Sequence, residues 1–306
     1  VLTSRSGAST PAAREAVETL EKAGAAVRIA KVDVSDLDGM AMLFADMQAG
    51  PNPLRGIVHA AGVSALDPVK DMTVDRLLSV CDSKVVGAWN LHRLTADIPL
   101  DFFVMFSSIA SVWGSAGQAH YAAANQFLDA LAHYRHDQGQ IALSANWGPW
   151  TGSGMASLEA RAWLSRIGVS GLPPHQALEA LDACLQSGAV QKTIAKVEWG
   201  RFTDVYEARH ARPFLEHIRE NLETLSGPRE KSAELIALES LPADEQRKQL
   251  IAIVQEEVAT VLGFPSASAV DIRTGLFDMG MDSISSVELR NSLEERLGWR
   301  LPTTAA

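Results

Sequence analysis

The first two hundred residues alternate between apolar runs of strand length and longer stretches with helical spacing. Apolar runs lie at 1–3, 25–32, 56–60, 101–107 and 141–147, and helical spacing lies at 11–22, 37–47, 74–94 and 119–133. Continuous apolar strands separated by amphipathic helices are typical of a parallel sheet covered on both faces. The order therefore predicts a doubly wound, Rossmann-like α/β sheet, whose ligands bind at the carboxyl ends of its strands.

A smaller second unit is expected beyond this sheet. Residues 222–243 are rich in charge, contain Ser-Gly-Pro and show no sustained strand pattern, which favours a linker. Apolar residues at helical spacing over 250–262 then predict a helix that Gly263 can end. A further helix is expected over 283–297. We therefore predict a first domain at 1–221, the linker, and a small all-α helical bundle at 244–306.

Composition argues against several classes of function. Lys and Arg number 27 and Asp and Glu number 37, and the resulting net charge of −10 disfavours a nucleic-acid partner. The sequence has no apolar run of membrane-spanning length and no signal peptide, and its two cysteines, Cys81 and Cys184, are expected as free thiols. A cytoplasmic protein is predicted. The chain begins without Met, and we expect both of its ends to be cuts rather than natural termini.

Four polar residues have the chemistry of a ketone reductase. Ser108 follows the strand at 101–107, and Tyr121 and Asn125 lie one helical turn apart, on one helix face. Lys84 lies upstream. Ketone reduction needs a proton for the oxygen while hydride attacks the carbon, and a tyrosine with a pKa of about 10 must be tuned to supply it. A nearby ammonium is expected to lower that pKa, and a serine hydroxyl can hold the carbonyl oxygen.

Two phrases resemble a known family. FSSIASVWGSAGQAHYAAANQFLDALA (106–132) and SKVVGAWNLH (83–92) resemble the ketoreductases of polyketide synthases, a branch of the short-chain dehydrogenase/reductase superfamily. In most of that superfamily a lysine lies four residues after the tyrosine. Here Asn125 occupies that position and Lys84 comes from upstream, as in polyketide and fatty-acid synthase ketoreductases. The resemblance implies that Lys84, Ser108, Tyr121 and Asn125 are catalytic, without a metal ion.

The resemblance also implies NADPH as cofactor. Arg5 would lie near its extra phosphate, a role that suits a guanidinium, although a solvated loop arginine is the alternative. Asp33, with Val34 beside it, would contact the adenine, although Asp33 could instead be a helix N-cap. The backbone of His59-Ala60-Ala61-Gly62 would pass the ribose. The sequence contains no GxGxxG, so we expect the first strand and the Gly-rich phosphate loop to lie upstream.

The phrase LFDMGMDSISSVELRNSLEERLG (276–298) resembles the acyl carrier domains of type I synthases. The resemblance implies that Ser283 carries 4′-phosphopantetheine, attached by a separate phosphopantetheinyl transferase. A helix N-terminus suits the phosphodiester electrostatically. A serine beside an acidic residue at a helix start is otherwise often only an N-cap. The last helix of the carrier domain is expected beyond residue 306.

Three residues resemble those that guide the substrate in this family. Trp113 lies eight residues before Tyr121, and residues 63–68 lack a Leu-Asp-Asp motif, which together resemble the A-type ketoreductases that form an L-hydroxyl group. Gln118 stands where a histidine would imply selection of an epimerised α-methyl group. Trp147 belongs to a motif that precedes a mobile lid in the family. The alternative for Trp113 is simple packing beneath its loop.

The sequence thus predicts NADPH-dependent reduction of a carrier-bound β-ketoacyl thioester. A carrier and scaffold module with an idle reductase fold is the alternative, and the carrier motif argues against a free-standing dehydrogenase. The resemblance implies upstream ketosynthase and acyltransferase domains and a homodimer of the whole synthase.

Overall fold

The computed structural model describes residues 1–152, 154–208, 212–226, 231–299 and 301, without the side chains of 222–226 and 283. The chain forms two compact units, which consist of 1–161 with 171–196 and of 162–170 with 197–306. Each unit has its own hydrophobic core. Among the described residues, none of the helices is both long and apolar enough to cross a membrane.

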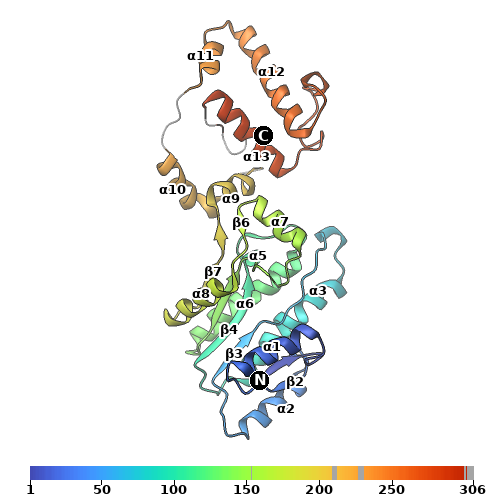
Figure 1. Cartoon of the computed structure of the whole chain (residues 1–306), viewed down its shortest axis with the longest axis vertical. Helices are drawn as coiled ribbons and strands as arrows, with labels where there is room; N and C mark the ends of the chain where they lie inside the picture. Colours follow the sequence, from blue (N-terminus) through green and yellow to red (C-terminus); the bar gives the residue numbers. More distant parts are fainter. Residues whose placement is uncertain (153, 209–211, 227–230, 300, 302–306) are drawn as a thin grey trace. The chain divides into compact units, whose positions relative to one another are not determined.

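The first unit is built on parallel strands. In the described residues, strands β3 (Gly56–His59), β4 (Phe102–Ser108), β5 (Leu143–Trp147) and β7 (Gln191–Ile194) form one sheet in that order. Strands β1 (Leu2–Ser4) and β2 (Ile29–Lys31) pair with each other in parallel. The predicted parallel sheet with flanking helices is therefore confirmed (Figure 1).

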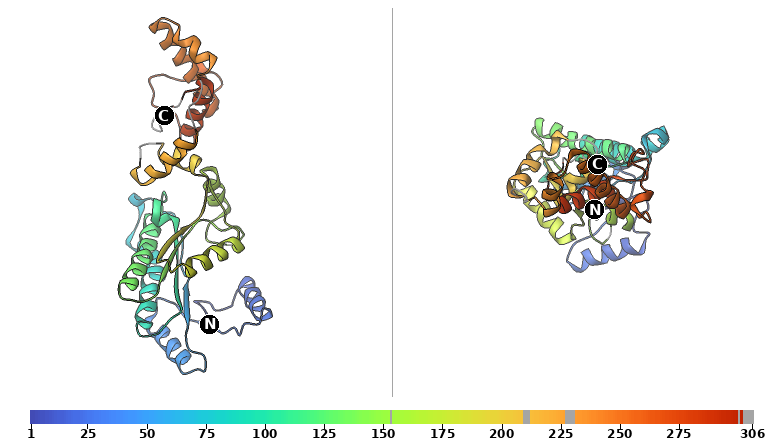
Figure 2. Two further views of the ribbon diagram at one scale, coloured as in Figure 1. Left: turned by 90° about the vertical axis from the view of Figure 1, so that its left-hand side faces the viewer. Right: turned by 90° about the horizontal axis from the view of Figure 1, so that it is seen from above.

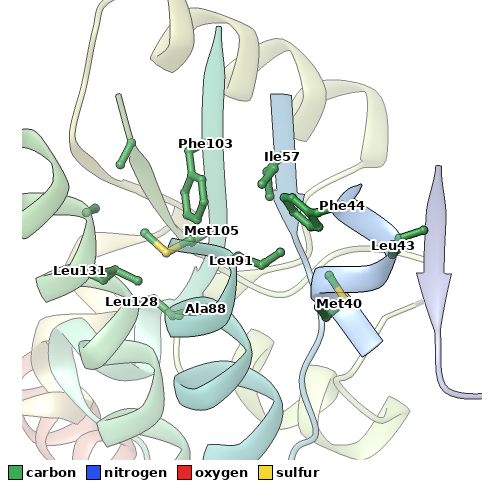
Figure 3. Packing of buried hydrophobic residues seen from close by; sticks show 12 residues of the cluster. Met40, Leu43, Phe44, Ile57, Ala88, Leu91, Phe103, Met105, Leu128 and Leu131 are labelled. Carbon is green, nitrogen blue, oxygen red and sulfur yellow. The ribbon is translucent and has the colours of Figure 1, made fainter. Parts of the chain in front are cut away.

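Helices cover both faces of the larger sheet (Figure 2). The helices of this unit are α1 (Pro11–Lys22), α2 (Leu37–Gln48), α3 (Val74–Cys81), α4 (Gly87–Leu94), α5 (Ile109–Trp113), α6 (Ala119–Asp137) and α8 (Pro174–Gln186), and α7 (Leu158–Arg166) reaches the unit's edge. Alternate side chains of a strand point to opposite faces. Phe103 and Met105 accordingly pack with α2, α4 and α6 (Figure 3), whereas Phe106 packs beside Trp147 and α8.

The single helix predicted over 74–94 is interrupted in the structure. Residues Asp82–Val86 form a π-helical segment between α3 and α4. Each hydrogen bond of a π segment spans one residue more than in an α-helix, and such segments often occur at functional sites. Here it keeps Val80 and Ala88 in the core on either side and turns Lys84 inward, where only 2% of the residue is exposed. The periodicity of the sequence did not reveal this break.

The second unit is mainly helical. It contains α9 (Trp199–Tyr206), α10 (Glu216–Ser226), α11 (Ala233–Glu239), α12 (Ala243–Leu262) and α13 (Ser283–Leu297), and the short strands β6 (Val169–Ser170) and β8 (Lys196–Val197) lie at the unit boundary. Gly263 ends α12 in the left-handed conformation with φ 72°, as predicted. Helix α11 falls within the expected linker, yet Leu238 packs into the core of α12 and α13. Seven residues are too few for a periodic pattern to stand out.

Candidate active site

The carboxyl ends of the strands bring the predicted polar residues to one edge of the sheet. In the parallel register His59 of β3 lies opposite Met105 of β4, and Ser108 of β4 lies opposite Trp147 of β5. The residues that follow these strands therefore lie side by side, as the sequence order predicted.

Ser108, Tyr121 and Asn125 meet at this edge. Ser108 ends β4 and caps α5, because its hydroxyl accepts a hydrogen bond from the Ala110 amide at 3.2 Å. Tyr121 and Asn125 lie one turn apart on α6, and the Asn125 amide donates to the backbone oxygen of Tyr121 at 2.7 Å. The side chains of Ser108 and Asn125 lie near the Tyr121 phenol, and both favour its ionised form. A strand end and one helix face thus supply three of the four predicted catalytic residues.

Lys84 completes the group from the π segment. Its ammonium donates to the backbone oxygen of Phe106 at 2.8 Å and lies 5.7 Å from the centre of the Tyr121 ring. The lysine is buried, so water does not screen its charge from the ring. The structure therefore brings Lys84 next to Tyr121 although the two residues are far apart in the sequence.

Burial dominates the electrostatics of this group. It raises the pKa of Tyr121, and the hydrogen bonds of Ser108 and Asn125 only partly offset this effect. The net shift of the Tyr121 pKa is therefore upward, opposite to the lowering expected from an ammonium, because the cost of burying a phenolate exceeds what these two neighbours return. Burial also lowers the pKa of Lys84 from 10.5 to about 8. Asp129 acts in the opposite direction and raises this pKa, but its effect is smaller. For His59, burial and then the charge of Lys84 lower the pKa to about 4, so its imidazole is neutral.

Arg5 and Asp33 line one open pocket of about 590 Å³ together with Lys31. Asp33 accepts hydrogen bonds from the backbone amide of Ser35 at 3.0 Å and from its hydroxyl at 2.8 Å. These bonds, and more weakly the charge of Arg5, hold the pKa of Asp33 below its usual value. The N-cap of α2 is Asp36, so the alternative of Asp33 as a helix cap is wrong. The pocket thus combines two exposed cations, Arg5 and Lys31, with two carboxylate side chains, Asp33 and Asp36.

Two glycines allow close packing around Lys84 and Val34. A Cβ atom on Gly62 would lie 2.8 Å from Cε of Lys84, and one on Gly87 would lie 2.6 Å from Cγ1 of Val34. Carbon atoms in contact are normally about 3.5–4.0 Å apart. The segment His59-Ala60-Ala61-Gly62 therefore passes directly over the lysine arm, with His59 buried and Ala60 and Ala61 exposed.

Comparisons with known proteins agree with this geometry. Residues 1–152 match the KR domain family, and residues 252–306 match the family of the phosphopantetheine attachment site. The chain thus contains a KR domain followed by a phosphopantetheine attachment domain, and the curated proteins that it resembles are polyketide synthases, several of them of type I. It is 39% identical over 310 residues to polyketide synthase GfsB of Streptomyces halstedii and 36% identical over 305 residues to erythronolide synthase EryA3 of Saccharopolyspora erythraea. Each alignment covers 99% of this chain, but only 6% and 9% of those synthases.

Solved ketoreductases have the same fold. A structure described as an A1-type ketoreductase has a TM-score of 0.70 and 41% identity, and it covers 74% of this chain and 48% of its own. The first ketoreductase of the tylosin polyketide synthase has a TM-score of 0.65 and 39% identity, over 72% of this chain and 49% of its own. The chain therefore spans about half the length of these solved ketoreductases.

Hydrogen bonds join two loops of the ketoreductase beside Tyr121. The amide of Gln118 donates to the Ser64 hydroxyl at 3.0 Å, and its oxygen accepts from Ser115 at 2.8 Å. The backbone amide of Asp67 donates to the Gly117 oxygen at 2.7 Å. Gln118 thus connects the segment that lacks the Leu-Asp-Asp motif with the turn that precedes the tyrosine.

The two predicted substrate-guiding tryptophans differ in their surroundings. Trp113 is half-buried and is the last residue of α5. Trp147 is 6% exposed and packs between Phe106 and Trp150, with ring centres 5.3 and 5.0 Å apart. In this structure Trp147 belongs to the core, whereas Trp113 lies on the segment between Ser108 and Tyr121.

In the carrier domain, helix α13 begins at Ser283, as predicted. Its N-cap is Asp282, whose carboxylate accepts from the amides of Ile284 at 3.0 Å and Ser285 at 2.7 Å. The alternative that Ser283 is merely the N-cap is therefore wrong. The side chain of Ser283 lies outside the described residues. Its backbone stands at the first helical position, where the helix dipole favours a negative group.

Sequence reasoning missed Asp129, a buried acidic residue of α6 that forms hydrogen bonds with Ser111, Ser144 and Asn146. Its neighbours Leu128, Leu131 and Ala132 are core residues. The sequence did contain one signal, which is a single acidic residue among apolar residues on one face of the expected helix. Such a residue needs polar partners when the helix face is buried.

Proposed function

We propose that this segment reduces a β-ketoacyl thioester, held on phosphopantetheine at Ser283, to the β-hydroxyacyl thioester. The observation that carries the proposal is the meeting of Lys84, Ser108 and Tyr121, together with Asn125, at the carboxyl edge of the sheet. The KR domain and the carrier domain on one chain supply the class of enzyme and the form in which the substrate arrives.

In this mechanism Tyr121 is the proton donor. Because burial raises its pKa, the phenol stays protonated at neutral pH and can donate to the developing alkoxide. The Ser108 hydroxyl, which lies near the phenol, can hold the carbonyl oxygen in reach of it. The Lys84 ammonium stabilises the phenolate that remains after the proton is donated. The lysine need not move to do so, because its hydrogen bond to the Phe106 backbone oxygen already holds it beside the ring.

We propose NADPH as the cofactor, bound by Arg5, Asp33, Val34 and the segment His59-Ala60-Ala61-Gly62. When bound, it supplies the hydride. The pocket fits the adenosine end of this cofactor, since Arg5 and Lys31 line it and can bind a 2′-phosphate. Asp33 is ionised and accepts hydrogen bonds, which suits contact with the adenosine. Gly62 lets the backbone approach closely above Lys84.

We further propose that the product has an L-configured β-hydroxyl group. Trp113 lies on the segment between the two proposed catalytic residues Ser108 and Tyr121, and Gln118 of the same segment donates a hydrogen bond to Ser64 of the neighbouring loop. A bulky indole there can block one entry side and guide the pantetheine arm along the other. The likeness to solved A-type ketoreductases at 41% identity supports the same assignment.

The competing proposal is an idle reductase fold that serves as scaffold. Within the full synthase, Tyr121→Phe separates the two. We expect reduction of a β-ketoacyl thioester to fall by at least about 10²-fold, because no other group donates the proton, while NADPH binding and thermal stability are unchanged. Tyr134→Phe, at an exposed tyrosine of the same helix, is the matched control. The scaffold proposal would be favoured if the parent enzyme did not reduce the thioester. It would also be favoured if the reduction rate of the Tyr121→Phe variant were within a few-fold of the parent rate.

A further inference from the structure

The segment from Gly62 to Asp67 connects the two parts of the reductase group. It begins at Gly62, where a Cβ atom would lie 2.8 Å from Cε of Lys84. It ends beside the turn that leads into α6, because the backbone amide of Asp67 donates to the Gly117 oxygen at 2.7 Å. Tyr121 follows that glycine by four residues. The segment therefore runs from the proposed catalytic lysine to the start of the helix that carries the proposed catalytic tyrosine.

A buried imidazole contacts Asp67 from α6. The side chain of His120 is fully buried, and its Nε2 lies 3.3 Å from Oδ2 of Asp67, which is ion-pair distance. Within the described residues, neither ring nitrogen of His120 forms a hydrogen bond, and neither does Oδ2 of Asp67. A buried polar group is costly without a partner. The place of each side chain therefore depends on the other.

The second oxygen of Asp67 has a partner on α3. Nε of Arg76 lies 3.5 Å from Oδ1 of Asp67, but 60% of the arginine side chain is exposed. Water and salt screen such an exposed pair, so its contribution is small. Oδ2, on the His120 side of the carboxylate, is buried. Asp67 thus connects its own segment to α3 and to α6, and the contact with α6 is the one that solvent does not screen.

Two further contacts fix the same segment and leave one apolar side chain open. The amide of Gln118 donates to the Ser64 hydroxyl at 3.0 Å. Leu66 lies over Gly117, where a Cβ atom would be 3.0 Å from Cδ1 of the leucine. Even so, 73% of Leu66 is exposed. A fixed segment that presents an apolar side chain beside a catalytic group is typical of the wall of a ligand site.

We propose that Asp67 and His120 are positioning residues, and that their contact is a latch that holds the 62–67 segment as one wall of the acyl-binding site. Leu66 of this wall contacts the apolar chain of the β-ketoacyl thioester. The role of the wall in binding the substrate rests on the proposed function, whereas the contact between Asp67 and His120 does not. Without the latch the wall is formed in only a fraction of the molecules, and the apparent affinity for the substrate falls by that fraction.

Asp67→Ala in the full synthase tests the latch. This substitution removes both contacts of the carboxylate but keeps the backbone amide that donates to Gly117. In hydrogen exchange followed by mass spectrometry, peptides from the 62–67 segment should exchange at least about tenfold faster, because the segment opens locally. If the wall is then formed in about a tenth of the molecules, KM for a β-ketoacyl thioester rises about tenfold, while kcat stays within about twofold because the bound substrate selects the formed wall.

Asp71→Ala is the matched control, since it removes an exposed carboxylate from the same connection between β3 and α3. It should change neither the exchange nor KM. His120→Leu is a second variant, which removes the latch without leaving a buried polar group unpaired. Combined with Asp67→Ala, it should raise KM no further than either change alone, because the two residues act as one unit. Should Asp67→Ala fail to fold, His120→Leu is judged by the same criteria.

The possible results separate the latch, the wall and the proposed function. Unchanged exchange in both variants would overturn the latch. Faster exchange with an unchanged KM would overturn the wall. A merely structural role predicts a lower Tm and a lower kcat with KM unchanged, and that result would also overturn the inference. If the parent synthase does not reduce the thioester, the proposed function and the wall are wrong, while the exchange rates still decide whether the latch exists.

Discussion

Because Gly62 packs closely on Lys84, a small substitution at Gly62 should displace the Lys84 side chain without unfolding the protein. In Gly62→Ala the new Cβ would lie 2.8 Å from Cε, 3.3 Å from Nζ and 3.5 Å from Cγ of Lys84. Carbon contacts are normally about 3.5–4.0 Å, so Cε must withdraw by about 1 Å. The ammonium moves with it, away from the Phe106 oxygen that now holds it at 2.8 Å.

A shift of about 1 Å in a catalytic group can cost about 10²-fold in rate. We therefore expect kcat to fall by about 10- to 100-fold. The free energy of unfolding should fall by only about 1 kcal/mol, at the low end of the cost of overpacking, because the atom met is on a flexible side chain. The assay follows NADPH absorbance with a β-ketoacyl thioester in the full synthase, with thermal unfolding and NADPH binding measured in parallel.

Gly200→Ala is the control, since a Cβ there meets nothing within 4 Å. It should change neither kcat nor NADPH binding. The reasoning would be refuted by a Gly62→Ala enzyme whose kcat stays within twofold of the parent. It would also be refuted if the loss of rate were fully explained by weaker NADPH binding, because the contact then disturbs the cofactor rather than the lysine.

Three further predictions follow from the same geometry. Turnover should fall as pH rises through about 8, since Lys84 is an ammonium below that pKa and loses its charge above it, and a kcat profile flat from pH 7 to pH 9 would contradict this role. Coenzyme A and a broad phosphopantetheinyl transferase should add one arm to the carrier domain, seen by intact-mass spectrometry, and Ser283→Ala should abolish the gain while Ser285→Ala should not. Chiral chromatography should find the L-hydroxyl product from a β-ketoacyl pantetheine thioester; a mainly D-hydroxyl product would overturn the A-type assignment and leave the reductase standing.

Much of the architecture could be predicted from the sequence, because it depends on short-range patterns. Helix α1 at Pro11–Lys22 and helix α13 at Ser283–Leu297 have the predicted bounds. Both have strong local start signals, since Thr10 caps α1 ahead of Pro11 and Asp282 caps α13. Tyr121 and Asn125 could be paired for the same reason, since a spacing of four residues fixes a shared helix face wherever the helix lies.

Only the tertiary structure decided the chemistry around those residues. The π segment at Lys84, the sign of the pKa shift of Tyr121 and the buried hydrogen bonds of Asp129 all depend on what packs against a side chain. The burial of these side chains results from contacts with α5, β4, β5 and α6, which are separated along the chain. Spacing reports which residues share an element, whereas the cost of a charge depends on the groups that other elements bring to it. The sequence therefore determined which residues are candidates for the site, and the fold determined how deeply each is buried and which groups surround it.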